Sequence, residues 1–456
     1  MKQLLLLSLG LILFLSSCEK KSIEEPEPEP ITELEISPDL AEKWSSMTLN
    51  TIKISPQNSP TYASRSLGYM GLTMYESVVN GSILYKSIAP ELNGLGALPV
   101  KENIKDTDWE LALNAGQSFM LKSLYPHAPT YIFMQIDSLY EGVISEKRSD
   151  GIPDSVILSS TAYGKSIAEA IWEWAKTDGG DMAYLRTFDF SYAYPRGPHM
   201  WFPPIAGQSS VVAPMHPTWG SNRTFVKANS ELPVPQINEV SLDTSSVYYK
   251  DMKMVYDTFN TLTKEQKESA LWWGDDPSAS ASPPGHSYYL ANKLVHAQKP
   301  NLFEATSVYA KVGMSVADAF INCFKCKYTY HSERPRNYIV RVIDSRFNQF
   351  WPEPPFPAFT SGHSTQAAAA ATSLISVFGN DVKVEDDFHK GRPKDLIRNT
   401  EFVERSFDHI WDFAEECGYS RIYGGIHTPQ DNKMGLEEGK KIGTIISNLS
   451  WRSPEL

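Results

Sequence analysis

The chain has few cysteines, few basic residues and no long apolar run beyond its N-terminus. Only four cysteines occur in 456 residues, and 42 Lys and Arg are outnumbered by 54 Asp and Glu, for a formal net charge of −12. After residue 18 no apolar run is long enough to cross a bilayer as a helix. An acidic chain of this kind argues against nucleic acid and anionic membrane faces as partners, although a small basic pocket remains compatible with it.

Cys323 and Cys326 form a C-x-x-C pair that suggests zinc binding or redox chemistry. A structural zinc site needs four ligands, and neither a second C-x-x-C nor a matching histidine pair accompanies these two. Thioredoxin-like chemistry would require a βαβ setting, which the sequence does not indicate. We therefore interpret both as small core residues, whether or not they are oxidised to each other.

The amino-acid composition is typical of a folded protein. Hydrophobic residues make up 41% of the chain and aromatic residues 12%, which suits a large packed core. The length allows either one large domain or two to three ordinary ones.

The N-terminus has the pattern of an export signal. Lys2 precedes a short apolar run, Leu4 to Leu15, and Leu-Ser-Ser-Cys then resembles a bacterial lipobox ending at Cys18. Residues 1–17 are therefore predicted to be removed and Cys18 to be acylated, which would anchor the protein by lipid alone at the bacterial cell envelope. The alternative is an ordinary cleaved signal with an incidental cysteine. Residues 18–40, rich in Glu and Pro, are predicted to be an extended tether.

Helical periodicity dominates the rest of the chain. The clearest predicted helices cover residues 65–79, 159–175, 365–378 and 405–416. Regions 185–245 and 274–286 lack periodicity and read as long ordered loops, and convincing alternating strands are scarce. The sequence predicts a mostly α-helical fold.

The first chemically suggestive segment is Lys327-x6-Arg334-Pro335. Seven residues are about two helical turns, so both cations are expected to project to the same side of one element, which Pro335 ends or kinks. Taken alone, this pattern is more typical of a solvated basic face.

The second segment is Thr360-Ser361-Gly362-His363, at the start of the Ala-rich helix. A Ser and a Gly at a helix N-terminus present a hydroxyl and free amides to an anion, and His363 would face it from the first turn. The alternative is an ordinary N-cap with a bystander histidine.

The third segment is Ser420-Arg421-x5-His427-x3-Asp431. Arg421 offers a planar fork for oxyanion oxygens. Asp431 lies one helical turn after His427, where it can hold one ring nitrogen and fix the tautomer. A buried histidine satisfied by a carboxylate is the alternative.

Together the three segments supply three cations, two imidazoles, a hydroxyl and helix-terminal amides, a set that suits a small tetrahedral oxyanion. In this order they resemble the signature of the type 2 phosphatidic acid phosphatase and vanadium haloperoxidase superfamily, and the wider chain is similar to its bacterial haloperoxidase-like group. The resemblance implies an all-α fold of two four-helix bundles in one helical unit, vanadium chloroperoxidase/acid phosphatase-like. Residues 41–300 would form the N-terminal half and residues 301–456 the C-terminal, oxyanion-binding half.

The resemblance also implies a vanadate-dependent haloperoxidase, in which hydrogen peroxide oxidises halide to hypohalous acid that reacts with small organic acceptors. Vanadate would be bonded through His427 and held by Lys327, Arg334, Ser361, the Gly362 amide, His363 and Arg421. His363 would act as acid–base, Lys327 would polarise the bound peroxide, and Asp431 would support His427. The sequence leaves open whether the chain forms a homodimer.

Two positions bear on the halide. Phe356, seven residues before His363, matches the aromatic of chloroperoxidases and bacterial iodoperoxidases rather than the histidine of algal bromoperoxidases. Phe324 and Lys325 stand where the family often has Trp-Asp, and Lys325 is expected to point away from the site. These features favour iodide, the halide that is easiest to oxidise.

Two other classes of function are compatible with the same residues. In an acid phosphatase of the superfamily, His427 would be the nucleophile and His363 would protonate the leaving group, but soluble bacterial phosphatases of this type are much shorter. A lipoprotein that only captures phosphate or vanadate would need the arginines but not both histidines.

The predicted anchor can be tested at Cys18. The Cys18→Ala variant is expected to leave the membrane fraction without change in activity, because acylation of this cysteine is the only predicted attachment. Fractionation of cells that express the wild-type chain or the variant provides the measurement. Unchanged membrane association of the variant would mean that the anchor lies elsewhere.

Overall fold

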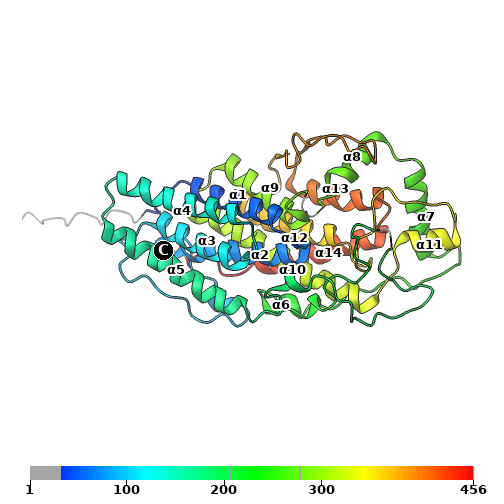
Figure 1. The fold of residues 1–456 in the computed structure, drawn as a ribbon, viewed down its shortest axis with the longest axis horizontal. Helices are drawn as coiled ribbons and strands as arrows, with labels where there is room; N and C mark the ends of the chain where they lie inside the picture. The colour runs from blue at the N-terminus through cyan, green and yellow to red at the C-terminus, as the bar shows by residue number, and fades with distance from the viewer. Residues whose placement is uncertain (1–31, 206, 277–278, 455–456) are drawn as a thin grey trace, which may run out of the picture. The chain divides into compact units, whose positions relative to one another are not determined.

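The computed structural model describes residues 32–205, 207–276 and 279–454. Residues 1–17, Cys18 and most of the predicted tether lie outside this part of the chain. The described residues from Leu34 onward form one compact unit, which is drawn in Figure 1. Its α-helices are α1 Asp39–Ile54, α2 Pro60–Glu76, α3 Trp109–Leu124, α4 Thr130–Ser149, α5 Asp154–Ala175, α6 Lys227–Ser230, α7 Val247–Asn260, α8 Lys264–Trp272, α9 Ser282–Gln298, α10 Leu302–Tyr330, α11 Pro335–Val342, α12 Gly362–Phe378, α13 Ile410–Tyr423 and α14 Pro429–Ser447.

The remaining regular elements are short. The described residues include four 3₁₀ helices, η1 Val79–Gly81, η2 Ala89–Glu91, η3 Ala183–Arg186 and η4 Trp219–Ser221. Strands β1 Val384–Asp386 and β2 Arg405–Phe407 pair antiparallel, with Val384 opposite Phe407 and Asp386 opposite Arg405. The predicted all-α class is confirmed. Among the described residues of the long loop expected at 185–245, only η3, η4 and α6 are helical, whereas the loop expected at 274–286 ends earlier than predicted because α9 begins at Ser282.

Helix α10 is the central element of the unit. It has 29 residues, most of which are buried, and it packs against α2 on one side and against α12 and α14 on another (Figure 1). Helices α1 to α5 gather around α2 and α3, and α12 to α14 pack on one another. One long buried helix therefore joins the N-terminal helices to the C-terminal helices.

Small residues allow these helices to approach closely. A Cβ added to Gly71 of α2 would lie 2.3 Å from the Tyr309 carbonyl oxygen of α10, and one added to Gly439 of α14 would lie 2.1 Å from the Thr365 carbonyl oxygen of α12. Contacts this short would force the helices apart. The Ala-rich run of α12, fully buried from residue 367 to residue 371, serves the same close packing.

The predicted helix boundaries shift for local reasons. Helix α2 begins at Pro60 after the Ser59 N-cap, whose hydroxyl accepts from the Tyr62 amide. The predicted helix 405–416 is wrong at its start, because Arg405 to Phe407 pair with β1 instead. Helix α13 begins at Ile410, where His409 and Asp412 form a capping box.

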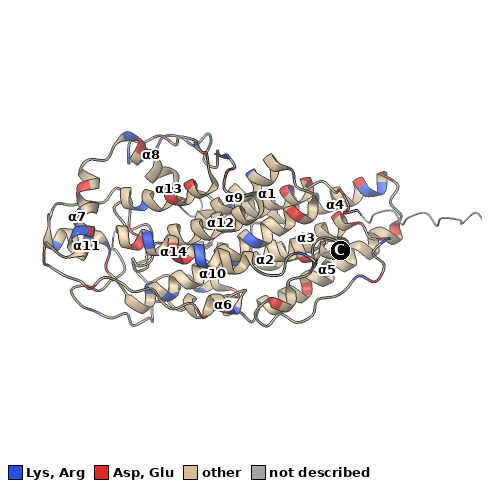
Figure 2. Ribbon diagram, turned by 180° about the vertical axis from the view of Figure 1, so that it is seen from behind, with Lys and Arg blue, Asp and Glu red and all other residues tan. Residues whose placement is uncertain are grey.

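No described helix combines the length and apolarity needed to cross a membrane. Basic and acidic residues are interspersed over the helices (Figure 2).

Candidate active site

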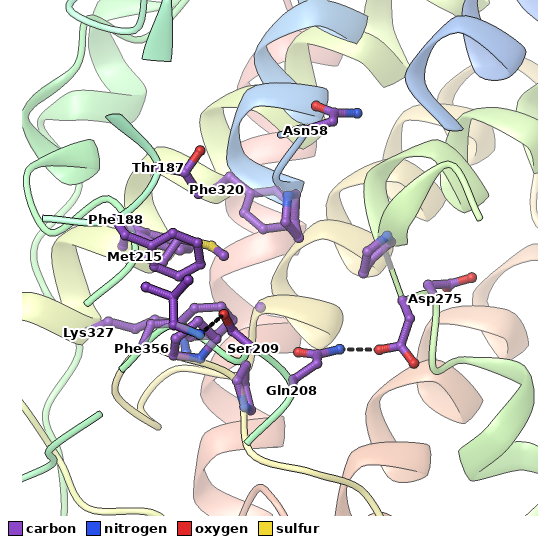
Figure 3. A pocket seen from close by; sticks show the side chains of 18 of the residues that line it. Asn58, Thr187, Phe188, Gln208, Ser209, Met215, Asp275, Phe320, Lys327 and Phe356 are labelled. Atoms are coloured by element: carbon purple, nitrogen blue, oxygen red, sulfur yellow. Dashed lines mark hydrogen bonds between the residues drawn. The ribbon is translucent and has the colours of Figure 1, made fainter. Parts of the chain in front are cut away.

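The three predicted segments meet at one cavity of about 890 Å³. Lys327, Gly362, His363, Arg421 and His427 line it, together with residues from the loops around residues 184–190 and 208–215. In Figure 3, Lys327 and Phe356 lie on one side of this cavity and Asp275 lies on the other. Arg334 and Ser361 are completely buried.

Lys327 and Arg334 do not share one element, which corrects the prediction from their spacing. Helix α10 ends at Tyr330, where His331 takes a left-handed conformation with φ of 48°, and Arg334 is the N-cap of α11. The chain turns between the two cations. Their side chains nevertheless meet at the Pro357 carbonyl oxygen, 3.0 Å from the Lys327 Nζ and 3.3 Å from an Arg334 nitrogen.

The Lys327 ammonium is held by main-chain carbonyl groups. Its Nζ donates to the carbonyl oxygens of Pro357, Ala358 and Thr360 at 3.0, 2.7 and 2.5 Å. Burial lowers its pKa to about 8, so the amine is still largely protonated at neutral pH. Lys327 therefore brings a positive charge to the site and also fixes the backbone that leads into α12.

Arg334 connects two loops around His427. Its Nη1 donates to the Ile426 carbonyl oxygen at 2.9 Å and lies 3.0 Å from the His427 Nε2. Its Nη2 donates to the Phe356 carbonyl oxygen at 2.9 Å. The Phe356 ring lies 5.1 Å from the Lys327 Nζ and 5.4 Å from the Arg334 guanidinium carbon, so both cations contact one aromatic face.

Contacts on both nitrogens fix the tautomer of His427. Its Nδ1 lies 3.0 Å from the Asp431 carboxylate, which also accepts from the Thr428 amide at 3.0 Å. Because a carboxylate accepts and a guanidinium donates, Nδ1 carries the proton and Nε2 carries the lone pair. Burial, reinforced by Arg334 and Lys327, lowers the His427 pKa well below its usual range. The imidazole is therefore neutral, with an unprotonated Nε2 that accepts from Arg334.

The N-terminus of α12 lies at the same cavity. Ser361 is the N-cap, and its hydroxyl accepts from the Ser364 amide at 3.3 Å. A Cβ on Gly362 would meet nothing closer than the Cys323 Sγ at 3.8 Å. The absence of a side chain therefore leaves the amide end of the helix open to the cavity.

His363 follows in the first turn of α12. Its ring makes a hydrogen bond to the Trp273 backbone, while its buried Nε2 has no partner in the described part of the chain. Burial first, and then the charge of Arg421, lowers the His363 pKa well below its usual range. The ring is therefore neutral, a state suited to accepting a proton.

Arg421 reaches the cavity from α13. Its Nε donates to the Ser420 hydroxyl at 3.0 Å and its Nη2 to the Ala270 carbonyl oxygen at 2.6 Å. Burial lowers the pKa of Arg421, and likewise that of Arg334, to about 10. Both guanidinium groups therefore remain charged at neutral pH.

The donor set suits an oxyanion because several buried polar atoms of the described residues have no hydrogen-bond partner. Within the described residues, the Arg334 Nε, the Arg421 Nη1 and the His363 Nε2 are buried without a hydrogen-bond partner. Buried polar atoms are nearly always paired, so such a group calls for an explanation. A small tetrahedral anion near the α12 N-terminus would accept from the two guanidinium nitrogens, a hydroxyl group on it would donate to the His363 Nε2, and its charge would offset the buried positive charges.

Lys325 takes no part in this cluster. Its Nζ donates to the carbonyl oxygens of Ser230 and Leu232 at 3.1 and 3.3 Å, next to α6. The prediction that it points away from the site agrees with these contacts. Cys323 and Cys326 are buried free thiols on α10.

A second buried cluster, which the sequence analysis did not identify as functional, lies beside the cavity. Asp275 accepts from His286 Nδ1 and from His389 Nε2, each at 2.9 Å. The other His286 nitrogen lies 2.8 Å from Asp386 of β1. Burial opposes ionisation of His286, but Asp275 and Asp386 outweigh it and raise its pKa to about 10. A buried imidazolium between two carboxylates thus holds the cavity wall at Asp275.

The geometry of this cluster favours hydrogen bonding over metal binding. Asp275, His286 and His389 are close enough to hold a cation. However, Arg392 donates to the His389 Nδ1 at 3.1 Å, so the proton of His389 is on Nε2, which faces Asp275. A metal ligand would need a lone pair there. The sequence contains these residues in two short segments, Trp-Trp-Gly-Asp-Asp at 272–276 and Pro-Pro-Gly-His at 283–286. Only the fold brings these segments together with residues 386–389.

Comparisons with known proteins agree with this geometry. Residues 307–453 match the family model described as "VCPO second helical-bundle domain". The structure is similar to that of the first bacterial vanadium-dependent iodoperoxidase, with a TM-score of 0.78 and 29% identity over 94% of this chain and 99% of that chain. A bacterial vanadium-dependent chloroperoxidase in the holo form has a TM-score of 0.67 and 15% identity over 92% of this chain and 99% of that one. No curated protein sequence matches the chain.

The support that Asp431 provides to His427 can be tested with oxyanion binding. Asp431→Asn is expected to weaken binding of orthovanadate about 10–100-fold, because the amide no longer enforces a proton on Nδ1 and a lone pair on Nε2. Titration calorimetry measures the affinity. Glu437→Gln, at a half-exposed position on the same helix, is the control. Equal affinities of wild type and Asp431→Asn for orthovanadate would contradict the supporting role of Asp431.

The buried imidazolium predicts a pH-dependent stability. Because its folded pKa, about 10, exceeds the ordinary value of 6.5, its contribution is complete below pH 6.5 and is lost as the pH rises through the folded value. His286→Gln is expected to lower the free energy of unfolding by about 3–5 kcal/mol at pH 6.5 and to flatten its decline at alkaline pH. Urea unfolding at several pH values measures both effects. His296→Gln, at a largely exposed histidine, should change little, and a parallel pH profile for His286→Gln would contradict the assignment.

Proposed function

We propose that this chain is a vanadium haloperoxidase, in keeping with its similarity to the family model and to the bacterial iodoperoxidase, and that it uses orthovanadate and hydrogen peroxide to oxidise a halide, preferentially iodide, to hypohalous acid. One observation carries the proposal. The neutral His427, the Arg421 with its unpartnered Nη1 and the His363 with its unpartnered Nε2 line one cavity at a helix N-terminus, and Arg334, whose Nε is also unpartnered, contacts His427. A pure anion binder needs the guanidinium groups, but it has no use for two neutral imidazoles.

Each residue would hold the anion in a different way. His427 Nε2 would supply the single protein bond to vanadium, and Asp431 keeps that nitrogen unprotonated. The free Arg334 Nε and Arg421 Nη1 would donate to the vanadate oxygens, with the Gly362 amide at the end of α12. Lys327 would contribute chiefly its charge, because its three protons already serve three carbonyl groups. It can donate to the anion or to peroxide only by giving up one of them.

His363 is the acid–base group in this proposal. Its low pKa leaves Nε2 unprotonated at neutral pH, so it can take a proton from incoming hydrogen peroxide and return one to a leaving oxygen. When bound, vanadate supplies Lewis acidity that activates the peroxide without a change in oxidation state. The cavity would give the halide access to His363 and to the bound anion.

The aromatic surroundings support iodide. Phe324 and Phe356 lie with their ring centroids 5.3 Å apart beside Lys327, and both line the cavity. A large, weakly hydrated anion loses less solvation energy in such a place than chloride does. Iodide also requires the least strongly activated peroxide.

Two further expectations belong to the proposal. The export signal and Cys18 suggest that the reaction takes place on a lipid-anchored enzyme at the bacterial cell envelope. The hypohalous acid would react with organic acceptors in that compartment.

The proposal can be tested by reconstitution. Protein freed of metal is expected to gain peroxidase activity with orthovanadate, with phosphate as a competitor, and to turn over iodide faster than bromide, with little chloride oxidation. The same preparation without vanadate should hydrolyse p-nitrophenyl phosphate slowly. Activity that follows iron, haem or zinc would refute the proposal, comparable turnover of bromide would refute the iodide preference, and fast phosphate-ester hydrolysis without halide oxidation would favour the phosphatase alternative.

The two histidines should behave differently. His427→Ala is expected to abolish vanadate retention, whereas His363→Ala should retain vanadate but lose about 10²–10⁴-fold in halide oxidation, the usual cost of one acid–base group. Vanadium content after gel filtration and initial rates of triiodide formation separate these outcomes. Mild, equal effects of both changes would indicate a structural role for the pair.

A further inference from the structure

A second cavity lies apart from the candidate active site. Its volume is about 560 Å³, and it is bounded by α10, by the last turns of α12 and α14, by the segment between η1 and η2 and by the segment that follows α14. It shares no lining residue with the cavity at His427. Lys311 of this second cavity and Lys327 lie 16 residues apart on α10, which is about 24 Å along the helix axis. A ligand in this cavity would therefore not contact the candidate active site.

The charge of this cavity is opposite in sign to that of the whole protein. Lys86, Lys311 and Arg452 line it, and Glu304 is the one acidic residue among the described residues of the lining, whereas the chain carries a net charge of −12. Glu304 lies 3.7 Å from Arg452 and so offsets one of the three cations. The C-termini of α12 and α14 add only partial negative charge, and amides of the residues that cap them already donate to their last turns. The cavity therefore keeps a positive excess.

Lys311 is the cation that is least compensated. Its side chain is only 8% exposed, and its Nζ lies 3.3 Å from the Ser376 hydroxyl and 5.1 Å from the centre of the Trp451 ring. No carboxylate in the described part of the chain forms an ion pair with it. Burial first, and then the charge of Arg452, lowers its pKa to about 8 in spite of Glu304. The amine is still largely protonated at neutral pH, so it is a buried charge that lacks a counter-ion.

A second incompletely satisfied group lies at the end of α14. The Ser447 Oγ is buried and has no hydrogen-bond partner among the described residues, and Ser447 lines the same cavity as Lys311. Buried polar atoms are nearly always paired, so this hydroxyl calls for an explanation. An anion in the cavity could accept from the Ser447 hydroxyl and from the Lys311 ammonium together.

Main-chain pairing holds the other two cations in place. Tyr85 and Arg452 form an isolated antiparallel β-bridge, and the Lys86 amide donates to the Trp451 carbonyl oxygen at 3.1 Å. An Arg452 nitrogen also donates to the Tyr85 hydroxyl at 3.2 Å. The side chains of Lys86 and Arg452 are exposed, so both can reach a ligand from solvent. Because the backbone of this rim is already paired, binding would cost little conformational entropy.

Charge and volume together define the class of ligand. Three cations and one carboxylate leave room for about two negative charges, which favours a phosphate group, with a charge of about −1.5 to −2 at pH 7, over a single carboxylate. Phosphate oxygens also match the planar fork of an arginine. The volume lies within the roughly 300–1,000 Å³ range of pockets for small organic molecules, so the cavity can also hold an organic group attached to the phosphate.

We propose that this cavity binds a phosphate group, either as free phosphate or as the monoester of a small organic molecule. Lys311 and Ser447 would donate to the phosphate oxygens from inside the protein, and Lys86 and Arg452 would bind them from the exposed side. The phosphate would supply the counter-charge that Lys311 lacks. This site is independent of the proposed vanadate site and does not rest on the proposed function.

Titration calorimetry on the full chain tests the proposal, with inorganic phosphate and glycerol 3-phosphate as separate probes. Because phosphate is also expected to enter the cavity at His427, the binding that belongs to the second cavity is identified by its dependence on Lys311. Lys311→Met keeps an unbranched side chain of similar length and removes the charge. It is expected to weaken this binding at least tenfold, while competition of phosphate with orthovanadate at the other site stays unchanged.

Variants at the exposed cations guard against an effect of Lys311→Met on folding. Arg452→Ala is expected to weaken the same binding about tenfold and Lys86→Ala about threefold. Both side chains are exposed, so their removal carries little risk to folding. Lys53→Ala, at an exposed lysine in the last turn of α1 that does not line the cavity, is the matched control and should bind both probes as the wild type does.

The two probes separate the two sources of the phosphate group. Tighter binding of glycerol 3-phosphate than of inorganic phosphate, lost in Lys311→Met, would assign the cavity to a monoester, and equal affinities would assign it to free phosphate. If neither probe shows binding that is weakened by Lys311→Met and by Arg452→Ala relative to Lys53→Ala, the proposal is wrong. This result does not depend on whether the protein oxidises halide, so the two proposals can fail separately.

Discussion

The site depends on the burial of three cations, Lys327, Arg334 and Arg421, around one cavity. A buried charge costs several kcal/mol unless hydrogen bonds and counter-charges compensate for it. The protein supplies backbone carbonyl groups as acceptors, from residues 356–360 for Lys327 and Arg334, from Ile426 for Arg334 and from Ala270 for Arg421. These loops must therefore be in place for the cations to be buried, and the residual positive charge remains available to an anion.

The neutral groups of the site are set by the same environment. Burial keeps both His427 and His363 unprotonated, with help from Arg334, Lys327 and Arg421 at His427 and from Arg421 at His363. The two rings are oriented by different partners, Asp431 and the Trp273 backbone. Under the proposed function, one imidazole would then serve as a ligand and the other as an acid–base group. On the opposite wall, Asp275 is held by His286 and His389. The division of roles follows from hydrogen-bond partners rather than from any difference between the residue types.

The loops that hold the buried cations also form the mouth of the cavity. The segment from Glu353 to Thr360 provides acceptors for Lys327 and Arg334, and it also anchors the loops at Gln208 and Met215 that form the mouth. Phe356 belongs to this segment and faces the cavity beside both cations. A change in this segment is therefore expected to alter anion binding and access to the cavity together.

The sequence by itself determined the helical class, because apolar residues recur at helical spacing. It also determined the candidate site residues, because three segments resemble a known signature in residue type, spacing and order. Helix ends were predicted less well: α13 begins after β2 because residues 405–407 gain a partner strand that is distant in sequence. Only the tertiary structure decided that Lys327 and Arg334 lie on different elements, that Asp275, His286, Asp386 and His389 form one cluster, and that a large aromatic cavity adjoins the cations. The reason is that local patterns report on neighbours within a few residues, whereas these features depend on packing between segments about 10 to 200 residues apart.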